Sequence, residues 1–283
     1  MPDLNDKRLA RPAGAAVPRQ VIMPAAPLRD QPQEAARLDT QLLCGEVADV
    51  FREEGGFALV RARRDHYTGW VPVAALSREV MAPTHKVSAL LTLGFRAPDL
   101  KSPNPSLLPL GALLTVTGQR EGAWIDCGRS GWVHERHLAG LDVFSADPAG
   151  IAERFLEAPY LWGGRGEPGL DCSGLTQQAF EACGVLLPRD SDMQAAWAGD
   201  ELDHWQAPGA LKRGDLIFWE GHVGIMTRPD ELLHANAWHM AVAREPLSAA
   251  ISRISRIAGE VTCVRRVNVA RTRGVTPEWM AVD

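Results

Sequence analysis

The apolar positions of the chain, from Val21 onward, fall in short runs that glycine, proline and aspartate interrupt. Short apolar runs between turn-forming residues are typical of small antiparallel strands. Before this point, residues 1–20 are rich in proline, alanine and charged side chains, a composition that predicts a flexible leader. We therefore expect the folded part of the chain to begin with strands at residue 21.

An internal repeat runs through this strand-rich region. The sequence Gly-Trp-Val occurs at 69–71 and again at 131–133, and each copy closes a stretch that opens with a glycine inside an apolar run. The distance between the two copies corresponds to the length of one small β-barrel. The repeat therefore predicts two tandem all-β barrels, the first over 21–80 and the second over 83–144.

Beyond residue 144 the pattern changes to helical spacing followed by strands. An Asp-Pro pair at 147–148 is a typical helix start, and the apolar spacing predicts two more helices over 173–183 and 191–198. The expected strands cover residues 216–219, 222–226, 232–235 and 261–267. Helices followed by an antiparallel sheet predict an α+β domain over 147–270, with a loose tail over 271–283.

Composition and charge exclude several classes of protein. The 283 residues are 46% apolar and 23% charged, ordinary values for a folded globular chain. The formal net charge of -5 argues against a nucleic-acid partner. No apolar stretch of signal-peptide length follows the N-terminus and no run is long enough to span a bilayer, so we expect a cytoplasmic protein without membrane association. The widely spaced cysteines favour a reducing compartment without disulfides: Cys44, Cys127, Cys172, Cys183 and Cys263.

The sharpest local feature is Cys172, which follows a glycine-rich turn over 163–169 and stands at the start of the helix expected over 173–183. The unpaired N–H groups at a helix start stabilise an anion and lower the pKa of a thiol. The glycines allow the backbone to approach a ligand closely. We therefore expect Cys172 to be a reactive nucleophile, whereas Cys183, on the apolar face of the same helix, is expected to be a core residue.

A nucleophilic thiol needs a base, and the base needs a group that orients it. His222 stands at the head of one expected strand, between two glycines, and His234 lies in the next strand. A turn at 228–230 joins the two strands, so antiparallel pairing brings the histidines side by side. His222 would then take the thiol proton, and His234 would hold the second ring nitrogen of His222, as in a catalytic triad.

Two other interpretations of these residues remain open. A zinc site can be drawn from Cys172, His222, His234 and His239, although no closely spaced ligand pair such as Cys-x-x-Cys is present. Each of these residues, taken alone, is also a common core or surface residue. Their joint order on the elements that catalysis needs favours the triad.

Five motifs, read together, resemble the signature of the NlpC/P60 family of cysteine peptidases. They are Tyr160-Leu161-Trp162-Gly163-Gly164, Asp171-Cys172-Ser173-Gly174-Leu175, Arg213-Gly214-Asp215-Leu216, Gly221-His222-Val223-Gly224-Ile225 and His234. The resemblance covers roughly residues 147 to 270 and implies a papain-like fold with Cys172, His222 and His234 as the triad. It also implies that the hydroxyl of Tyr160 helps to bind substrate or to stabilise the oxyanion. A core aromatic residue is the alternative for Tyr160.

The two expected barrels resemble bacterial SH3-like modules. Two such modules ahead of this catalytic domain resemble the γ-D-glutamyl-L-diamino acid endopeptidases, the dipeptidyl-peptidase VI group. The resemblance implies cleavage between D-glutamate and the diamino acid of peptidoglycan stem peptides that have a free N-terminal L-alanine. In that group the first SH3-like module walls off the groove, so that only a free N-terminus fits.

Four residues match positions that this group uses for the free amine. Asp171 and Ser173 match residues that meet the ammonium end of the substrate, where a carboxylate gains charge-assisted hydrogen bonds. The alternative for Asp171 is a charge at a helix N-terminus. Glu46 and Tyr67, from the first barrel, are the candidates for closing the amine pocket. Asp215 also matches a family position, but a Gly-Asp pair before a strand is explained as turn chemistry.

The sequence therefore predicts a papain-like α+β cysteine peptidase preceded by two small all-β SH3-like barrels, which recycles cell-wall peptides in the cytoplasm. Its partner is a small muropeptide, L-Ala-γ-D-Glu-diamino acid, and neither a metal nor an organic cofactor is expected. A cell-wall amidase or acyltransferase that uses the same Cys-His-His site is one alternative. A non-catalytic muropeptide-binding protein is the other, although the presence of all three residues argues against it.

Overall fold

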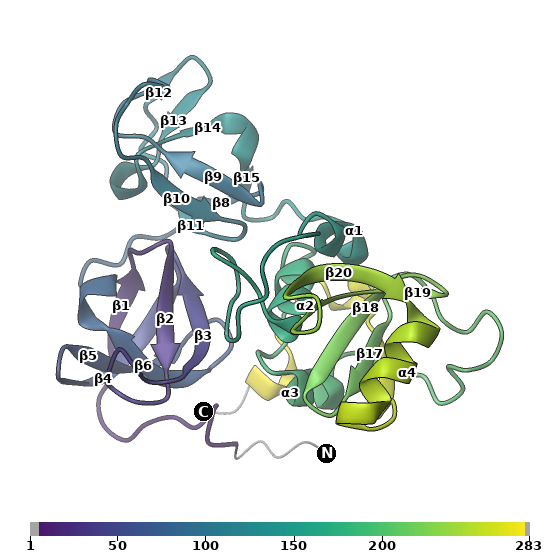
Figure 1. Cartoon of the computed structure of the whole chain (residues 1–283). Coiled ribbons are helices and arrows are strands. Elements are labelled where there is room, and N and C mark those ends of the chain that lie inside the picture. Colours follow the sequence, from purple (N-terminus) through teal and green to yellow (C-terminus); the bar gives the residue numbers. More distant parts are fainter. Residues whose placement is uncertain (1–5, 281–283) are drawn as a thin grey trace. The chain divides into compact units, whose positions relative to one another are not determined.

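A computed structural model of the chain describes residues 6–280 and divides it into two compact units (Figure 1). One unit is all-β and ends at Val143. The other begins at Phe144 and combines helices with an antiparallel sheet. The division falls where the sequence changes from strand-like to helical spacing, and each unit contains a hydrophobic core cluster of its own.

The all-β unit begins with a seven-stranded antiparallel sheet in the order β3-β2-β6-β5-β4-β1-β7. Its strands are β1 (Val17–Val21), β2 (Ala25–Arg29), β3 (Leu38–Leu43), β4 (Val47–Glu54), β5 (Phe57–Ala62), β6 (Thr68–Pro72) and β7 (Leu76–Ser77), with a 3-10 turn, η1 (Val73–Ala75), before the last. Alternate residues of β2 and of the first half of β4 are buried, as expected of strands with one face on a core.

This sheet begins earlier than the sequence predicts. β1 starts at Val17, inside the expected leader, and pairs with both β4 and β7. Pro18 is tolerated in it because β7 pairs only with Gln20 and Val21, so Pro18 faces no strand on that side. The expectation of a flexible leader over 1–20 is therefore wrong from residue 17 onward, and its first five residues lie outside the described part of the chain.

The strands after residue 83 form three small sheets, in the orders β10-β9, β11-β8-β15 and β12-β13-β14. They are β8 (His85–Val87), β9 (Leu91–Gly94), β10 (Ser106–Pro109), β11 (Leu113–Leu114), β12 (Arg120–Glu121), β13 (Trp124–Asp126), β14 (Trp132–His134) and β15 (Leu138–Gly140), with 3-10 turns η2 (Gly128–Ser130) and η3 (Glu135–His137). One core cluster lies among them and includes Val87, Leu108, Leu114 and Val133. The second barrel over 83–144 stays a prediction.

At both glycines of the Gly-Trp-Val repeat, a neighbouring segment packs too closely for a larger side chain. A Cβ on Gly69 would lie 2.2 Å from the side chain of Leu28, and one on Gly131 would lie 2.4 Å from the carbonyl oxygen of Phe95. Both distances are far shorter than a van der Waals contact, so a larger residue fits neither position without a shift of its neighbours. The repeat is thus explained by the close approach of a second segment in both halves of the unit.

The α+β unit is built on a six-stranded antiparallel sheet in the order β16-β21-β17-β18-β19-β20 (Figure 1). Its elements are α1 (Pro148–Glu153), α2 (Cys172–Glu181), α3 (Ser191–Trp197), β16 (Asp200–Glu201), β17 (Leu216–Trp219), β18 (His222–Arg228), β19 (Glu231–Asn236), β20 (Ala241–Pro246), α4 (Leu247–Ala258), β21 (Cys263–Arg266), α5 (Val269–Thr272) and η4 (Glu278–Met280). The helices α1 and α2 pack against β18, whereas α4 packs against β19 and β20.

The core under α4 joins this helix to the middle of the sheet. It consists of Leu211, Ile217, Trp219, Met226, Leu232, Leu247, Ala250, Ile254 and Val264. The helices around 148, 173 and 191 and the four expected strands are all present within a few residues of their expected bounds. β20 and α4 were not expected. The expected loose tail also contains structure, because Trp279 of η4 is buried and stacks on Trp197 with ring centroids 6.2 Å apart.

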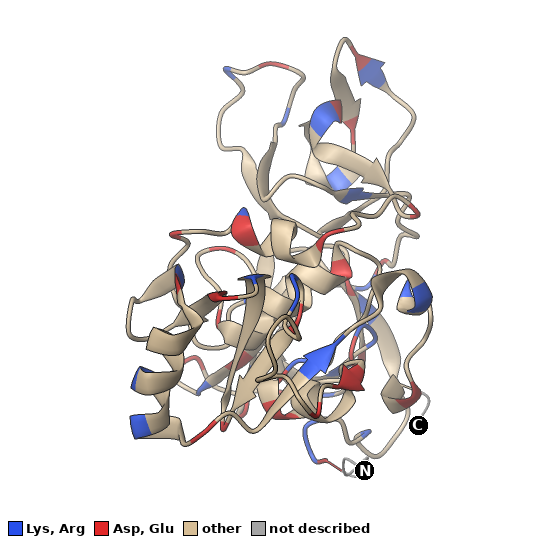
Figure 2. Ribbon diagram, turned by 90° about the vertical axis from the view of Figure 1, so that its right-hand side faces the viewer, with Lys and Arg blue, Asp and Glu red and all other residues tan. Residues whose placement is uncertain are grey.

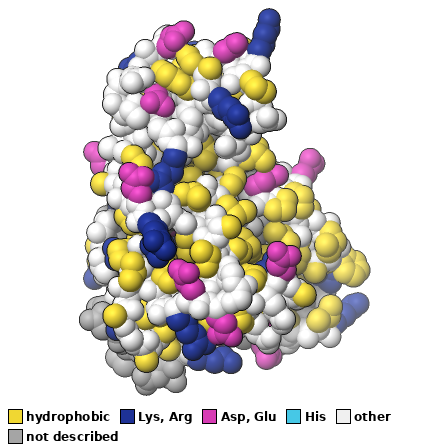
Figure 3. Space-filling view, turned by 90° about the vertical axis from the view of Figure 1, so that its left-hand side faces the viewer, with side chains coloured by type: hydrophobic (Ala, Val, Ile, Leu, Met, Phe, Trp, Pro, Cys, Tyr) yellow, Lys and Arg dark blue, Asp and Glu magenta, His cyan; other side chains and the backbone are white. Residues whose placement is uncertain are grey.

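The surface shows charges of both signs. Figure 2 shows Lys and Arg interspersed with Asp and Glu along the ribbon, in line with the small formal net charge. On the face presented in Figure 3, hydrophobic side chains form patches that charged side chains separate. None of the helices in residues 6–280 has both the length and the apolar character needed to cross a membrane. All five cysteines are free.

Candidate functional site

Cys172 is the first residue of α2, and only 7% of its surface is exposed. Asp171 is the N-cap of this helix, and its carboxylate accepts a hydrogen bond from the Gly174 N–H at 2.7 Å. Such a cap satisfies one of the first N–H groups of a helix, which have no partner within the helix. The local sequence therefore fixes the thiol at the beginning of a helix.

Burial raises the pKa of the Cys172 thiol to about 12, and the negative charge of Asp171 acts in the same direction. The backbone N–H groups of Val223 and Ser173 and the charge of Arg189 lower this pKa by less. The helix start therefore lowers the thiol pKa as expected, through the Ser173 N–H, but burial outweighs it and the pKa of Cys172 is raised overall. The helix start offsets only part of the cost of a thiolate in a place that excludes water.

The backbone of Val223 links the thiol to β18. Its N–H donates a hydrogen bond toward the Cys172 sulfur, which helps to stabilise a thiolate there. His222 directly precedes Val223 and is the first residue of β18. Because α2 packs against β18, Cys172 and His222 lie at the adjoining ends of two packed elements.

The two histidines form a direct hydrogen-bonded pair. His222 Nε2 lies 2.7 Å from His234 Nδ1, and the ring centroids are 5.0 Å apart at an interplanar angle of 63°. β18 and β19 pair antiparallel with Ile225 opposite Leu233. Continuing this register sets His234 opposite Gly224, two residues from His222, so both rings project from the same face of the sheet.

Burial determines the charge of both rings. Burial and, to a lesser extent, the neighbouring His234 lower the pKa of His222 to about 3. Burial also lowers the pKa of His234, whose side chain is 0% exposed, although the carboxylate of Glu245 acts in the opposite direction. Both rings are therefore neutral at neutral pH, and each donates through one nitrogen and accepts through the other.

Glu245 and Arg253 complete this cluster, and the sequence reasoning missed both. A carboxylate oxygen of Glu245, on β20, lies 2.7 Å from His234 Nε2. Arg253, on α4, donates to the same oxygen and lies over the ring of Trp238, 5.3 Å from its centroid. The available signal was the helical spacing of Leu247, Ala250 and Ile254, which predicts a helix that contains Arg253.

Arg189 is a third missed residue, and it fastens the start of α2. Its side chain is buried and makes a two-point ion pair with Asp171, at 3.0 and 2.7 Å. It also donates to the Ser173 hydroxyl at 2.9 Å and to the Gly164 carbonyl at 3.3 Å. The only sequence signal was an arginine between Pro188 and Asp190, in the loop before α3.

These contacts change the interpretation of Asp171 and Ser173. The Asp171 carboxylate accepts five hydrogen bonds, which come from Arg189, Gly163, Gly174 and the hydroxyl of Ser173. A carboxylate offers about four lone-pair sites, so a substrate amine that binds Asp171 must share these sites with the present partners. The structure supports the alternative that Asp171 is a helix N-terminal charge. Contact of Asp171 and Ser173 with a substrate amine stays a prediction.

Tyr160 lies in the segment before the glycine-rich turn, where it forms a bridge with Leu170. Burial raises the pKa of Tyr160, and the charges of Cys172 and Asp171 raise it further. Tyr160 is thus within electrostatic range of Cys172 and Asp171. The hydroxyl keeps its proton at neutral pH and can therefore donate a hydrogen bond.

Glu46 and Tyr67 belong to the all-β unit, and both are buried. The Glu46 carboxylate accepts a hydrogen bond from the Leu43 N–H at 3.0 Å and lies 3.7 Å from Arg64 Nε. Glu46 therefore has partners within its own unit. The predicted role of both residues in binding a substrate amine stays a prediction.

Three side chains in residues 6–280 offer ligand atoms that all lie within 4.8 Å of one another: His234, His239 and Glu245. This group lacks Cys172 and His222, so it is not the zinc site considered from the sequence. The Glu245 oxygen already accepts from His234 and Arg253, and the guanidinium beside it opposes a second cation. We interpret the group as a hydrogen-bonded network.

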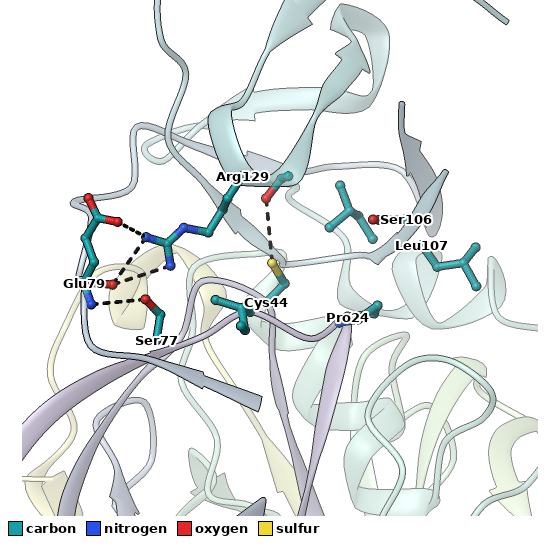
Figure 4. A pocket seen from close by; sticks show the side chains of 10 residues that line it. Pro24, Cys44, Ser77, Glu79, Ser106, Leu107 and Arg129 are labelled. Atoms are coloured by element: carbon teal, nitrogen blue, oxygen red, sulfur yellow. Dashed lines mark hydrogen bonds and ion pairs between the residues drawn. The ribbon is translucent and has the colours of Figure 1, made fainter. Parts of the chain in front are cut away.

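A pocket of about 380 Å³ lies in the all-β unit, between the first sheet and the strands after residue 83 (Figure 4). Arg129 extends to Glu79, which it meets at 3.0 Å, and the Cys44 sulfur faces the Ser130 hydroxyl at 3.9 Å. Its charged side chains thus pair with each other. None of the predicted site residues lines this pocket.

Two family models match parts of this chain. Residues 157–256 match the model of the NlpC/P60 family, and residues 28–76 match the model of the bacterial dipeptidyl-peptidase Sh3 domain. A relative named gamma-D-glutamyl-L-lysine dipeptidyl-peptidase, from Bacillus subtilis (strain 168), is 41% identical over 229 residues, which cover 70% of this chain and 72% of that protein.

Two further relatives extend the comparison. Dipeptidyl-peptidase 6 of Lysinibacillus sphaericus is 28% identical over 141 residues, 49% of this chain and 49% of that protein, so the match spans about half the length of this relative. The crystal structure of an NlpC/P60 family protein from Bacillus cereus ATCC 10987 superposes with a TM-score of 0.74 at 20% identity, over 88% of this chain and 99% of that one. This likeness shows a shared fold.

Proposed function

Because the chain belongs to the NlpC/P60 family of cysteine peptidases, we propose that it hydrolyses the γ-D-glutamyl bond to the diamino acid in peptidoglycan stem peptides with a free N-terminal L-alanine. The observation that carries the proposal is the 2.7 Å hydrogen bond between His222 and His234. His222 directly precedes Val223, whose backbone N–H donates toward the Cys172 thiol. Relatives named for γ-D-glutamyl-L-lysine cleavage support the choice of bond.

The reaction begins with the transfer of a proton from Cys172 to His222. The sulfur then bonds to the γ-carbonyl carbon of D-glutamate, and the carbonyl π electrons move to its oxygen. When the tetrahedral intermediate collapses, the C–N bond breaks and His222 gives its proton to the leaving amine. The product that remains is a thioester of L-alanyl-D-glutamate with Cys172.

Water completes the cycle. His222, again neutral, takes a proton from a water molecule, and the oxygen of that water attacks the thioester carbon. The C–S bond breaks, the thiol regains its proton from His222, and L-alanyl-D-glutamate leaves. The proposed steps use the side chains of the site and water alone.

The start of α2 and Tyr160 supply the groups that stabilise the developing oxyanion. As the first residue of α2, Cys172 has a backbone N–H without a partner inside the helix. Tyr160 keeps its proton because burial raises its pKa, and its hydroxyl is within electrostatic range of Cys172. Donors that are held in place before the reaction stabilise the charge without reorganisation.

Selectivity for the free amine rests on the resemblance to the dipeptidyl-peptidase group. We propose Glu46 and Tyr67, with Asp171 and Ser173, as the residues on which it depends. A charged amine gains hydrogen bonds with a carboxylate that an acylated amine does not make.

We further propose that the α+β unit is papain-like and that the strands after residue 83 form a second SH3-like module. The close approach of a second segment at both Gly69 and Gly131 supports the second module.

Three peptides test the proposal. We expect the protein to release L-lysine from L-Ala-γ-D-Glu-L-Lys, with a rate about 100-fold lower for the N-acetylated peptide, since about 3 kcal/mol is lost with a charge-assisted hydrogen bond. The α-linked isomer, L-Ala-α-D-Glu-L-Lys, is the matched control for the bond and should not be cleaved. Equal rates for the free and acetylated peptides would overturn the amine selectivity, and no cleavage of any peptide would overturn the substrate class.

A further inference from the structure

A chain of hydrogen bonds runs from His222 through His234 to Glu245. His222 Nε2 and His234 Nδ1 are 2.7 Å apart, and His234 Nε2 and a Glu245 oxygen are also 2.7 Å apart. Each imidazole in this chain therefore uses one ring nitrogen toward each neighbour. The chain ends on a carboxylate, which only accepts hydrogen bonds when it is ionised.

Glu245 is held in this ionised form. Its burial alone would raise its pKa, but the hydrogen bonds from His234 and Arg253 outweigh burial and lower the pKa below its ordinary value. Arg253 donates to the same oxygen that faces His234. Only 12% of the Glu245 side chain is exposed, so solvent weakly screens these charges. A carboxylate thus stands at the end of the chain at neutral pH.

The carboxylate determines where the protons lie on both rings. Because Glu245 can only accept, His234 must carry its proton on Nε2 and leave Nδ1 as an acceptor. His222 must then donate through Nε2, which leaves its Nδ1 without a proton. The second nitrogen of a histidine is commonly fixed by the hydrogen bond at the first.

We propose that Glu245 is a positioning residue that sets the tautomer of both histidines, so that His222 Nδ1 is the free base for the Cys172 proton. The inference rests on the proposed peptidase function of this site. It names a fourth member of the catalytic group that does not itself touch the substrate.

The backbone explains how Glu245 reaches this position. β19 and β20 pair antiparallel with His234 opposite Ala243 and Leu232 opposite Glu245. Glu245 is therefore a diagonal neighbour of His234 on the same face of the sheet. Arg253 approaches from α4, which packs on β19 and β20. A segment that the sequence reasoning overlooked thus supplies the group that orients the pair.

A second consequence concerns the charged intermediate. When His222 takes the thiol proton, the positive charge is shared along the hydrogen bonds to His234 and is balanced by Glu245. The carboxylate does not need to take the proton itself in order to stabilise the imidazolium. Loss of the carboxylate should therefore slow the chemical step and leave substrate binding unchanged.

Two substitutions separate orientation from charge. Glu245→Gln keeps an oxygen that accepts from His234, whereas Glu245→Met is of similar length and accepts nothing. Glu260→Met, in the exposed loop after α4, is the matched control. The tautomers are read from ¹⁵N imidazole spectra of the full chain, with signals assigned by His222→Asn and His234→Asn. Tripeptide kcat and KM and the rate of Cys172 alkylation by iodoacetamide are measured beside them.

The expected pattern is specific. Wild type, Glu245→Gln and Glu260→Met should show both histidines protonated at Nε2, and Glu245→Met should show mixed tautomers. In Glu245→Met, kcat should fall about 10- to 100-fold, KM should stay within about twofold of wild type, and alkylation of Cys172 should slow. The kcat and the alkylation rate of Glu245→Gln should lie between those of Glu245→Met and wild type. Folded Glu245→Met with wild-type tautomers and kcat would overturn the inference. If wild type cleaves no tripeptide, the proposed function fails, and the spectra and alkylation rates still decide the tautomer assignment.

Discussion

Cys172 and His222 are both held in their uncharged forms in the resting protein. Burial raises the pKa of the thiol to about 12 and lowers that of the imidazole to about 3. A thiolate facing an imidazolium is therefore less stable here than the neutral pair until a substrate carbonyl accepts the developing charge. This arrangement slows the reaction of the thiol with small oxidants and alkylating agents while the thiol remains competent toward a bound carbonyl.

The identity of these residues followed from the sequence, but their ionisation did not. A cysteine at a helix start and two histidines on consecutive strands are recognisable by type and order. The pKa of each depends on how completely the fold excludes water, which no local pattern records. Asp171 shows the same limit, because its two-point pair with Arg189 depends on a loop eighteen residues further along the chain.

The lowered pKa of His222 predicts a dependence of stability on pH. As the pH falls below 6.5, the unfolded chain binds a proton at this histidine, whereas the folded protein does so only near pH 3. The free energy of unfolding therefore decreases with falling pH over this window. We expect wild type to lose more stability between pH 7 and pH 4 than His222→Asn, which has no proton to bind. Urea unfolding at both pH values measures this, and equal losses would contradict it.

At the scale of elements, the start of α2 is shaped by glycines that touch one another's backbone. A Cβ on Gly174 would lie 2.2 Å from the Gly164 carbonyl oxygen, and one on Gly164 would lie 2.2 Å from the Gly169 carbonyl oxygen. The turn thus packs directly onto the helix that presents the thiol. The sequence predicted the turn and the helix, but it did not predict that they pack backbone to backbone.

Gly174→Ala tests this close packing. In an open helix this substitution stabilises by about 1 kcal/mol, because glycine is the poorer helix former. Here we expect destabilisation by about 1–3 kcal/mol, since the added Cβ must displace the Gly164 backbone. Urea unfolding measures the free energy of unfolding. The control is Ser252→Ala, on the exposed side of α4, which should change this free energy by less than about 0.5 kcal/mol. A Gly174→Ala protein more stable than wild type would refute the packing argument.

Other elements show where local patterns fail. β20 alternates only weakly between buried and exposed residues, and it was therefore not recognised as a strand. It nevertheless carries Glu245, because its pairing with β19 fixes its place. β1 was hidden by proline, and its pairing with β4 becomes visible only in the folded sheet. In both cases a tertiary partner decides the structure of a segment whose own composition is ambiguous.

At the scale of the whole molecule, the order of an all-β region followed by an α+β unit was predictable from composition and spacing. The match of residues 28–76 to a dipeptidyl-peptidase Sh3 domain and of residues 157–256 to the NlpC/P60 family confirms this order. The strands between them are two to four residues long in three small sheets. Such short strands leave little periodicity in the sequence, which explains why the organisation of this part was harder to derive.

The central claim is that the Cys172 thiol carries out the cleavage, and the measurement that tests it most directly is the release of L-lysine from L-Ala-γ-D-Glu-L-Lys by the full-length chain and two cysteine variants. We expect Cys172→Ala to lower the rate at least about 1,000-fold, because removal of the nucleophile removes the covalent route. Cys263→Ala, at a half-buried cysteine of β21, should cleave at the wild-type rate. Release of L-lysine by Cys172→Ala at the wild-type rate would contradict the account.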